Sequence, residues 1–492
     1  MKKLAPLCIL LAVTTLVAEE SKKPNFIVIM GEAQGWASLS APLDDTRTEG
    51  SSSRFILTPN LDSIARSGIR FSDFYASAPR CTPTRAAFFT GISPAALKMT
   101  FVNEGKKEGN VSPGDKVIPP DCTTELPVTV ETIADLLNKQ GYATAHFGKW
   151  HVGRNSPKEH GFDENDGANS NGGPDNVEDP NPKQCHEIVR QGIDFIEREA
   201  QAGKPFYLQL SEYPGRGIQT ASPETFLSVR NRLGSSADAY QVNLAAGDEE
   251  IDRTIGEVIA KVRDLGLEKN TYIIYTADHG AQGRNANGIL TNGKGSISEG
   301  GVRVPLLIQG PGIKPGMFSH VRASMMDLFP TIAELAGISP RLLPRGLEGG
   351  SLMGVIRGDG KASVQRPRDE LVIHFPHYDK DEMGPASAIL IGNYKLIRIY
   401  ESGERRLFDL STDISEQHDI ASANPEIVAS MDKKLSDYLL AVNAGLPSPN
   451  PNYDPAGVRS GDRHGMKGPG NGGGVGGKKS HPWKQPPPSP TP

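Results

Sequence analysis

The chain has 492 residues and a formal net charge of −5 at pH 7, which is enough material for one large or two moderate domains. Its hydrophobic content of 37% and charged content of 23% are typical of a globular enzyme and argue against a disordered or membrane-embedded protein. The negative balance also argues against a nucleic-acid-binding protein, which needs a basic face, although it permits a local cationic pocket for an anionic ligand.

The first 18 residues have the pattern of a secretory signal peptide. Lys2 and Lys3 precede a short apolar run over residues 4–17, and Ala18 is a suitable cleavage residue. The run is too short for a comfortable transmembrane helix, so an uncleaved membrane anchor is the weaker alternative. We therefore expect an exported protein, either periplasmic or secreted.

After this leader, apolar strand-like runs alternate with segments of helical periodicity. The expected strands cover residues 26–31, 71–77, 142–148, 206–210, 271–278 and 304–310. The expected helices cover residues 58–68, 82–90, 130–137, 187–202 and 251–262. This alternation predicts an α/β catalytic domain over residues 24–357 with a large, mostly parallel sheet. In such sheets, ligands bind at the carboxyl ends of the strands.

The pattern changes beyond residue 357. Four short strands follow one another closely in ELVIHF, ASAILIG, YKLIRIY and RRLFDLS, and residues 425–440 have the pattern of a helix. They predict a small subdomain of antiparallel sheet plus helix over residues 365–445. Pro, Gly, Asn and Lys dominate from there on, which predicts a disordered tail over residues 446–492.

Three cysteines remain once Cys8 is assigned to the leader. An odd number is unusual in an exported chain. The simplest arithmetic is a disulfide between Cys122 and Cys185, which leaves one cysteine with a different fate. The alternative is that all three stay reduced.

The segment of residues 81–91 reads C-T-P-T-R-A-A-F-F-T-G. Cys81 precedes a predicted helix, and a helix N-terminus favours an anion. Arg85, one turn further on, points back toward the same place. A lone cysteine before a helix is usually structural or merely reactive, but the whole string resembles the C-x-P-x-R-x-x-x-x-T-G signature of the formylglycine-dependent type I sulfatases.

Further matches to that family extend over residues 24–440. They are TPNLDSIARSGIRFSDFY, GYATAHFGKWHVG, TADHG, GKGSISEGGVRVP, DLFPTIAELAG and YKLIRIY…LFDLSTD. The resemblance implies an alkaline-phosphatase-like α/β domain with a small C-terminal subdomain, and hydrolysis of sulfate esters. It also implies that a formylglycine-generating enzyme oxidises Cys81 to formylglycine, and that a divalent cation, usually Ca²⁺, is bound. Export and an anion pocket favour a sulfated carbohydrate as the substrate.

The resemblance assigns roles to residues whose patterns alone are weak. Lys149 matches a residue that binds the sulfate and the formylglycine oxygen. His151 matches the base that takes a proton from the formylglycine hydroxyl after the other hydroxyl has attacked sulfur. Lys294 matches a cation near the leaving oxygen. Without the resemblance, the K-x-H and G-K-G patterns would be read as surface charges.

The predicted metal site departs from the family pattern. Asp278 and His279 match two cation ligands. Glu32 stands at the first of two adjacent aspartates, but Ala33 stands at the second and cannot ligate. Our hypothesis is that the carbonyl oxygen of Gln34 substitutes for it. The predicted ligands are therefore Glu32, Gln34, Asp278 and His279, and their reduced negative charge predicts weaker or altered metal preference.

The group that protonates the leaving alcohol is also in question. Where the family has a histidine after the strand of residues 206–210, this chain has Gly215 followed by Arg216. Arg216 can bind sulfate, but its pKa forbids proton donation. Lys294, His374 and His377 are the other candidates for this role. The alternative for the two histidines is that they only line the interface between the domains.

Two other functions are compatible with the sequence. One is a phosphomonoester or phosphonate ester hydrolase of the same superfamily, which the low number of metal ligands disfavours. The other is a non-catalytic, degenerate sulfatase that binds sulfated glycans, for which Ala33 and Gly215 speak. The intact motif at Cys81, together with Lys149, His151 and Lys294, speaks against it.

Overall fold

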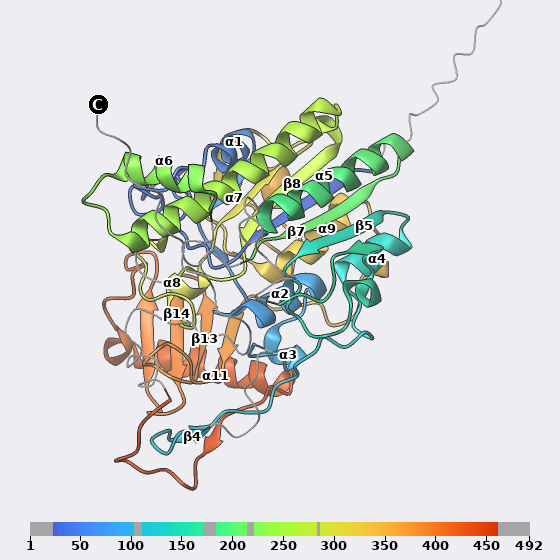
Figure 1. Cartoon of the computed structure of the whole chain (residues 1–492). Helices are drawn as coiled ribbons and strands as arrows, with labels where there is room; N and C mark the ends of the chain where they lie inside the picture. Colours follow the sequence, from blue (N-terminus) through green and yellow to red (C-terminus); the bar gives the residue numbers. More distant parts are fainter. Residues whose placement is uncertain (1–22, 103–110, 171–183, 214–220, 283–285, 461–492) are drawn as a thin grey trace, which may run out of the picture.

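The computed structural model describes residues 23–102, 111–170, 184–213, 221–282 and 286–460 (Figure 1). Within these residues, the largest sheet has eight strands. In spatial order they are β10 (Met317–Ser319), β2 (Ile69–Phe71), β9 (Leu306–Gln309), β8 (Thr271–Ala277), β1 (Asn25–Gly31), β7 (Phe206–Ser211), β5 (Ala143–Gly148) and β6 (Glu164–Asn165). All neighbours run parallel except β9, which is antiparallel to both β8 and β2. The predicted α/β class with a mostly parallel sheet is confirmed.

Helices cover both faces of this sheet, which is why its central strand is apolar throughout. Phe26, Val28 and Met30 of β1 pack into the core on one face, and Ile27 and Ile29 pack into the core on the other. The first face carries α2 (Cys81–Thr90), α4 (Ile133–Lys139), α9 (Leu328–Leu335) and α10 (Met353–Arg357). The second carries α1 (Pro59–Ser67), α5 (Cys185–Ala202) and α7 (Ala239–Asp264), with α6 (Pro223–Leu233) packed against α7 (Figure 1).

Local sequence signals fix the ends of several helices. Capping boxes start α4, at Thr132 with Asp135, and α7, at Asp238 with Gln241. Helix α2 ends at Gly91, which adopts the left-handed conformation with φ 66°. The short helices α3 (Pro94–Leu97) and α8 (Glu299–Val302) lie in connecting segments.

The single strand predicted over residues 71–77 is divided in two. β2 belongs to the large sheet, whereas β3 (Phe74–Tyr75) pairs with β11 (Ala323–Ser324) in a separate two-stranded sheet. The chain leaves the large sheet at Ser72, whose carbonyl accepts hydrogen bonds from the side chains of Trp36 and Arg303. The backbone carbonyl of Ser72 is thus bonded to side chains and not to a neighbouring strand, and the strand is interrupted there.

The C-terminal region forms the predicted antiparallel sheet and helix. Its strands are β12 (Leu371–Phe375), β13 (Ala386–Ile391), β14 (Tyr394–Ile399) and β15 (Arg405–Asp409), and they are neighbours in sequence order. One face packs on α11 (Pro425–Ala441), and the other packs against residues of the large domain that include Tyr75, Ala87 and Phe101. The small sheet is thus enclosed between α11 and the large domain (Figure 1).

The predicted tail is ordered over its first part. β16 (Ser448–Pro449) pairs with β4 (Val117–Ile118), and the backbone N of Ser460 donates to Asp115 Oδ1 over 2.8 Å. The prediction of disorder is therefore wrong for residues 448–460, because these contacts with Asp115 and β4 hold the segment. Its prolines do not prevent this, since proline is tolerated on an edge strand. Residues 461–492 and the predicted leader lie outside the described residues. None of the helices in the described part of the chain has the length and apolar character needed to cross a bilayer.

The predicted Cys122–Cys185 disulfide is absent from the structure, in which both residues are free cysteines. Cys122 packs beside the core of the C-terminal sheet. Cys185 is the first residue of α5, where it is buried, and α5 covers the second face of the large sheet. Burial raises the pKa of each thiol. Cys122 packs against the core of the C-terminal sheet, whereas Cys185 lies at the start of a helix of the large domain, so the arithmetic of cysteine pairing gave the wrong answer.

Candidate active site

The residues predicted to carry chemistry converge at the carboxyl ends of three strands. Glu32 follows β1, Lys149 follows β5, and Asp278 and His279 follow β8. These strands run parallel, so the segments that follow them lie at one edge of the sheet. Cys81 begins α2 at the same place. We call Glu32, Cys81, Arg85, Lys149, Asp278, His279 and Lys294 the Cys81 cluster.

Cys81 is enclosed by charged side chains. It is 1% exposed, and its Sγ lies 3.2 Å from His279 Nε2 and 3.5 Å from Glu32 Oε1. Burial and the charge of Glu32 raise the pKa of the thiol, but the surrounding positive groups, with Lys149, Lys294 and His279 foremost, together lower it well below its usual value. The N-terminus of α2 adds its own positive potential at this point. The surroundings therefore favour a negative charge at residue 81.

Two lysines hold the carboxylate of Glu32 from both sides. Lys149 Nζ lies 2.6 Å from Glu32 Oε2, and Lys294 Nζ lies 2.8 Å from Glu32 Oε1. Lys294 Nζ also lies 3.7 Å from Cys81 Sγ. Burial raises the pKa of Glu32, but the two lysines lower it well below its usual value, so this carboxylate is ionised.

Arg85 reaches the same cluster, as its place one turn into α2 predicts. Its Nε lies 3.1 Å from Asp278 Oδ2, and its Nη1 donates to the carbonyl of Lys149 over 2.6 Å. The side chain is fully buried. Burial and the nearby charge of Glu32 raise the pKa of Asp278 to about 6. Arg85 thus links the strand ends that carry Asp278 and Lys149.

Four side chains of the cluster fit a divalent cation. Glu32, Cys81, Asp278 and His279 are buried and offer ligand atoms that all lie within 4.8 Å of one another. Two carboxylates with an imidazole form a donor set of a kind that divalent ions use. A Ca²⁺ ion takes more oxygen ligands than these side chains provide, so water or a substrate oxygen would complete its shell.

Gln34 does not join this group, contrary to the hypothesis from the sequence. Its Oε1 accepts a hydrogen bond from the hydroxyl of Tyr275, and its Nε2 donates to Asp248 Oδ1 over 3.1 Å. The turn responsible is at Ala33, which adopts the left-handed conformation with φ 56° and donates its backbone N–H to Asp278 Oδ1. The amide of Gln34 therefore points toward α7 and β8, and a carboxylate is missing at position 33.

His151 lies beside the cluster on the chain that follows β5. It is buried and has a φ of 56°, a conformation that is uncommon outside glycine. Its backbone carbonyl accepts a hydrogen bond from Thr82 Oγ1 over 2.8 Å. Its position is thus fixed to the residue directly after Cys81. Residues held in such backbone conformations are frequent at functional sites.

The other candidates for the leaving-group acid lie elsewhere. His374 Nδ1 is 2.7 Å from Ser387 Oγ and its Nε2 is 2.8 Å from the carbonyl of Gly445, and burial lowers its pKa to about 4. Both nitrogens are engaged within the C-terminal subdomain, so His374 is not available to a substrate. His377 Nε2 lies 2.7 Å from Thr100 Oγ1 at the interface between the domains. Arg216 lies outside the described residues.

Two charged residues near the cluster were not predicted. Arg80, directly before Cys81, forms an ion pair with Asp379 of the C-terminal region, with Nη2 2.6 Å from Oδ1. Burial lowers the pKa of Arg80, but the charge of Asp379 raises it, so that the pKa lies above its usual value. The charges of Cys81 and Glu32 add to this increase. The only available signal was that Arg80 precedes the motif, because nothing in the sequence links it to Asp379.

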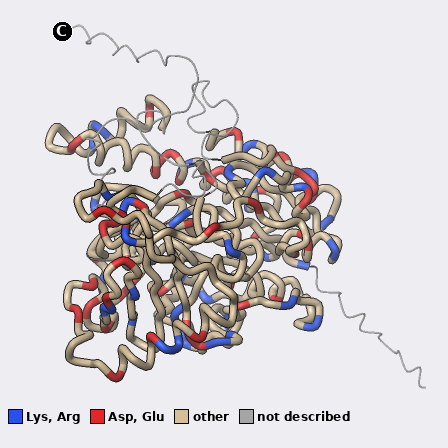
Figure 2. Tube along the Cα trace, turned by 90° about the horizontal axis from the view of Figure 1, so that it is seen from below, with Lys and Arg blue, Asp and Glu red and all other residues tan. Residues whose placement is uncertain are grey.

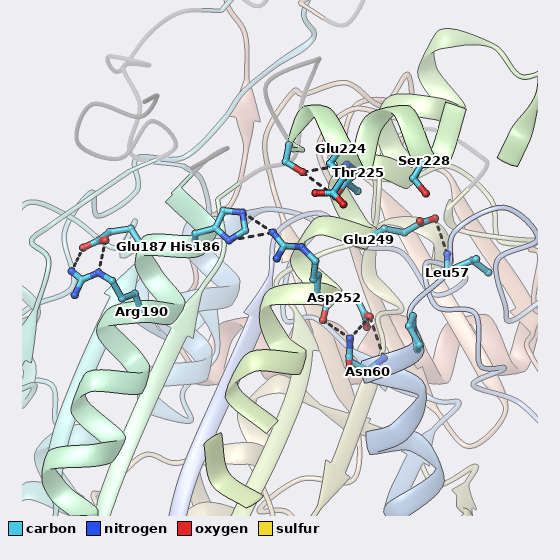
Figure 3. A pocket seen from close by; sticks show the side chains of 13 residues that line it. Leu57, Asn60, His186, Glu187, Arg190, Glu224, Thr225, Ser228, Glu249 and Asp252 are labelled. Atoms are coloured by element: carbon cyan, nitrogen blue, oxygen red, sulfur yellow. Dashed lines mark hydrogen bonds and ion pairs between the residues drawn. The ribbon is translucent and has the colours of Figure 1, made fainter. Parts of the chain in front are cut away.

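A cavity of about 920 Å³ lies between α1, α5, α6 and α7 (Figure 3). Several of its polar and charged side chains contact one another. Arg190 Nη2 lies 2.6 Å from Glu187 Oε1, and Asp252 Oδ2 accepts from Asn60 Nδ2 over 2.9 Å. None of the described residues that line it belongs to the Cys81 cluster. Acidic and basic residues are interspersed over the described trace (Figure 2).

Comparison with known proteins shows what this arrangement is similar to. Residues 24–338 match the family model described as Sulfatase. N-acetylgalactosamine-6-sulfatase of Mus musculus is 30% identical over 373 residues, a match that covers 68% of this chain and 66% of that protein, just under two thirds of its length. Arylsulfatase A of Homo sapiens is 29% identical over 499 residues, with 87% of this chain and 90% of that protein covered.

Solved structures share the fold. The crystal structure of Ps i-CgsB in complex with k-i-k-neocarrahexaose has a TM-score of 0.68 at 23% identity and covers 85% of this chain and 93% of that one. The PsFucS1 sulfatase from Pseudoalteromonas sp. has a TM-score of 0.67 at 21% identity, with 89% and 93% covered. At these identities the likeness concerns the fold alone.

Proposed function

Because this chain belongs to the sulfatase family, we propose that it is a hydrolase of sulfate esters whose reaction takes place at residue 81. The observation that carries the proposal is the position of Cys81 at the buried N-terminus of α2, with Lys294 Nζ 3.7 Å from its Sγ and Lys149 on the same carboxylate, Glu32. A helix N-terminus and fixed ammonium groups together stabilise the anionic sulfate group of a sulfate ester.

The substrate class that we propose is a sulfated carbohydrate. The name of the mouse relative indicates an enzyme that acts on a sulfated amino sugar, and the neighbouring structure Ps i-CgsB holds an oligosaccharide. The predicted export of the chain supports an extracellular polymer as the source of that substrate. We also propose a formylglycine-generating enzyme as the partner that converts Cys81.

Two groups would complete the site. As formylglycine, residue 81 would supply a hydrated aldehyde whose hydroxyl serves as the nucleophile. A divalent cation, when bound, supplies polarisation of the sulfate and of the nucleophile. Glu32, Asp278, His279 and residue 81 would hold that cation, since their ligand atoms lie within 4.8 Å of one another.

The remaining residues of the Cys81 cluster bind and orient the anion. Lys149 and Lys294 are positioned to donate hydrogen bonds to sulfate oxygens and to stabilise the charge that develops there. Arg85 holds Asp278 in place through its 3.1 Å ion pair. His151, joined through its carbonyl to Thr82, is assigned the removal of a proton from a hydroxyl at residue 81. Lys294 remains the candidate within the cluster for proton donation to the leaving alcohol.

The proposal is tested by two measurements on the full chain produced together with a formylglycine-generating enzyme. Mass spectrometry of the peptide that contains Cys81 is expected to show conversion to the aldehyde. The converted protein is then expected to hydrolyse an aryl sulfate and to leave an aryl phosphate largely intact, while Cys81→Ala is expected to hydrolyse neither ester. Preferred turnover of the phosphate would identify a phosphoester hydrolase instead, and binding of sulfated glycan without any turnover would identify a binding protein.

A further inference from the structure

The carboxylates of the Cys81 cluster are already paired with cationic side chains. Lys149 and Lys294 each contact a different oxygen of Glu32, at 2.6 and 2.8 Å. Arg85 contacts Asp278 Oδ2 at 3.1 Å. All five side chains are at most 1% exposed. A divalent ion that approaches these carboxylates therefore meets groups whose charge is already compensated.

The chain lacks a further carboxylate at position 33 that would offset the positive charge of these side chains. Ala33 brings no ligand, and Gln34 is turned toward Tyr275 and Asp248. The three cations and two carboxylates named above have a formal charge of +1, and a bound divalent ion would raise it to +3. Charge buried without compensation is strongly unfavourable. The cation is thus opposed by the same lysines that are placed to receive the substrate.

An anion relieves this opposition in two ways. A sulfate adds negative charge, and its oxygens accept charge-assisted hydrogen bonds from the ammonium groups. Once Lys149 and Lys294 donate to sulfate, the oxygens of Glu32 become available to the cation. The cost of bringing in either ion falls when the other is present.

We infer that the divalent cation and the sulfate anion bind this site cooperatively, with Lys149 and Lys294 as the side chains that couple them. The inference rests on the proposed function, since it takes sulfate as the anion and a divalent ion as the cation. If instead the lysines only brace Glu32, then the cation would bind with the same affinity whether or not sulfate is present.

The test is a calorimetric titration of CaCl₂ into the full-length mature protein, with either sodium sulfate or sodium chloride at equal ionic strength. Free Ca²⁺ is corrected for its pairing with sulfate. We expect saturating sulfate to lower the Ca²⁺ dissociation constant by about tenfold or more, and Ca²⁺ to lower the sulfate dissociation constant by the same factor, because coupling between two ligands is reciprocal. Equal Ca²⁺ affinity in the two salts would overturn the inference.

Variants identify the coupling residues. Lys294→Met is expected to tighten Ca²⁺ binding in chloride and to reduce the coupling factor to about twofold or less, on the scale of ordinary coupling free energies. The matched control is Lys433→Met, which removes an exposed lysine of α11 that pairs with Asp437 at 2.7 Å, and this variant is expected to keep the full coupling. A Lys294→Met protein that retains the wild-type coupling would exclude Lys294 as the coupling residue.

This experiment is separable from the test of the proposed function. The titrations measure binding of inorganic ions and need no turnover. A protein that hydrolyses aryl sulfate but binds Ca²⁺ independently of sulfate refutes only the cooperative binding. A protein that shows the coupling but hydrolyses no sulfate ester refutes only the proposed reaction.

Discussion

Arg80 and Asp379 form an ion pair that joins the residue before Cys81 to the C-terminal region of the chain. Arg80 donates through two nitrogens, Nε and Nη2, to the two oxygens of Asp379, which is 2% exposed. The same carboxylate borders the loop of Lys294, since a Cβ added to Gly295 would lie 2.8 Å from Asp379 Oδ2. One side chain of the C-terminal region therefore lies against both the residue before Cys81 and the loop that carries Lys294.

Asp379→Asn is expected to lower kcat/KM for an aryl sulfate by about ten- to a hundredfold, because small displacements of reacting groups have effects of that size. Loss of the carboxylate also leaves the largely buried Arg80 without its partner, so the free energy of unfolding should fall by about 3 kcal/mol. Steady-state kinetics and urea denaturation measure the two effects. Asp437→Asn, in an exposed ion pair with Lys433, is the control. Wild-type kcat/KM in Asp379→Asn would refute a positioning role.

Lys395 of β14 connects the C-terminal sheet to the large domain. Its Nζ lies 2.8 Å from both Glu299 Oε1 and Glu416 Oε1, and its side chain is fully buried. Lys395→Met leaves two buried carboxylates without their common partner and is expected to cost about 3–5 kcal/mol in the free energy of unfolding. Urea denaturation should show this loss, with partial recovery when Glu416→Gln is added. A loss as small as that of Lys433→Met, about 0–1 kcal/mol, would contradict the account.

Glu212 predicts a dependence of stability on pH. It follows β7, is 1% exposed, and its Oε1 has no hydrogen-bond partner in the described part of the chain. Burial raises its pKa to about 8. The folded protein thus retains a proton that the unfolded chain loses above about pH 4.5, so this contribution to stability is greatest below that pH and is lost progressively up to about pH 8.

Glu212→Gln removes this titration. The variant is expected to match the wild type at pH 5 and to be more stable by about 3–4 kcal/mol at pH 8. Denaturation at the two pH values measures the difference, with Glu268→Gln, at an exposed position, as the control. A stability difference that is the same at both pH values would show that Glu212 is ionised in the folded protein.

Gln34 and Asp278 are expected to differ in their effect on cation binding. Gln34→Leu deprives Asp248 and Tyr275 of a hydrogen-bond partner and should lower the free energy of unfolding by about 1–3 kcal/mol. Its Ca²⁺ affinity in the presence of sulfate should stay within about twofold of wild type, whereas Asp278→Asn should weaken it by about tenfold or more. Calorimetric titration compares them. Equal losses of affinity would restore Gln34 as a ligand.

The sequence predicted the fold, and the meeting of several candidate residues at one edge of the sheet, where the signal is local. The alternation of β1, α1 and the later strands with helices, and the motif that begins α2, depend on residues near one another in the chain. The parallel sheet then brings Glu32, Lys149 and Asp278 to one edge without further information. Predicting these features required only the periodicity of apolar residues and the position at which each strand ends.

The predictions that were wrong depend on long-range contacts. The direction of Gln34 is set by the left-handed conformation of Ala33 and by Tyr275 and Asp248, far along the chain. His374 is engaged by the carbonyl of Gly445. Residues 448–460 are ordered by contacts with Asp115 and β4. No short segment of sequence contains these partners, so pattern alone could not reveal them.

The position of β1 has a consequence for the order in which the chain folds. Among the described strands β1 comes first in the chain, yet it lies between β7 and β8, which come from the middle of the chain. One edge stays unpaired until residue 211 of β7 has been made, and the other until residue 277 of β8 has been made. Contacts between such distant segments form slowly. A nascent chain therefore emerges with a strand that is fully buried in the folded protein still unprotected, and it reaches its folded state only after more than half of its length is available. Fragments that end before β8 should not fold.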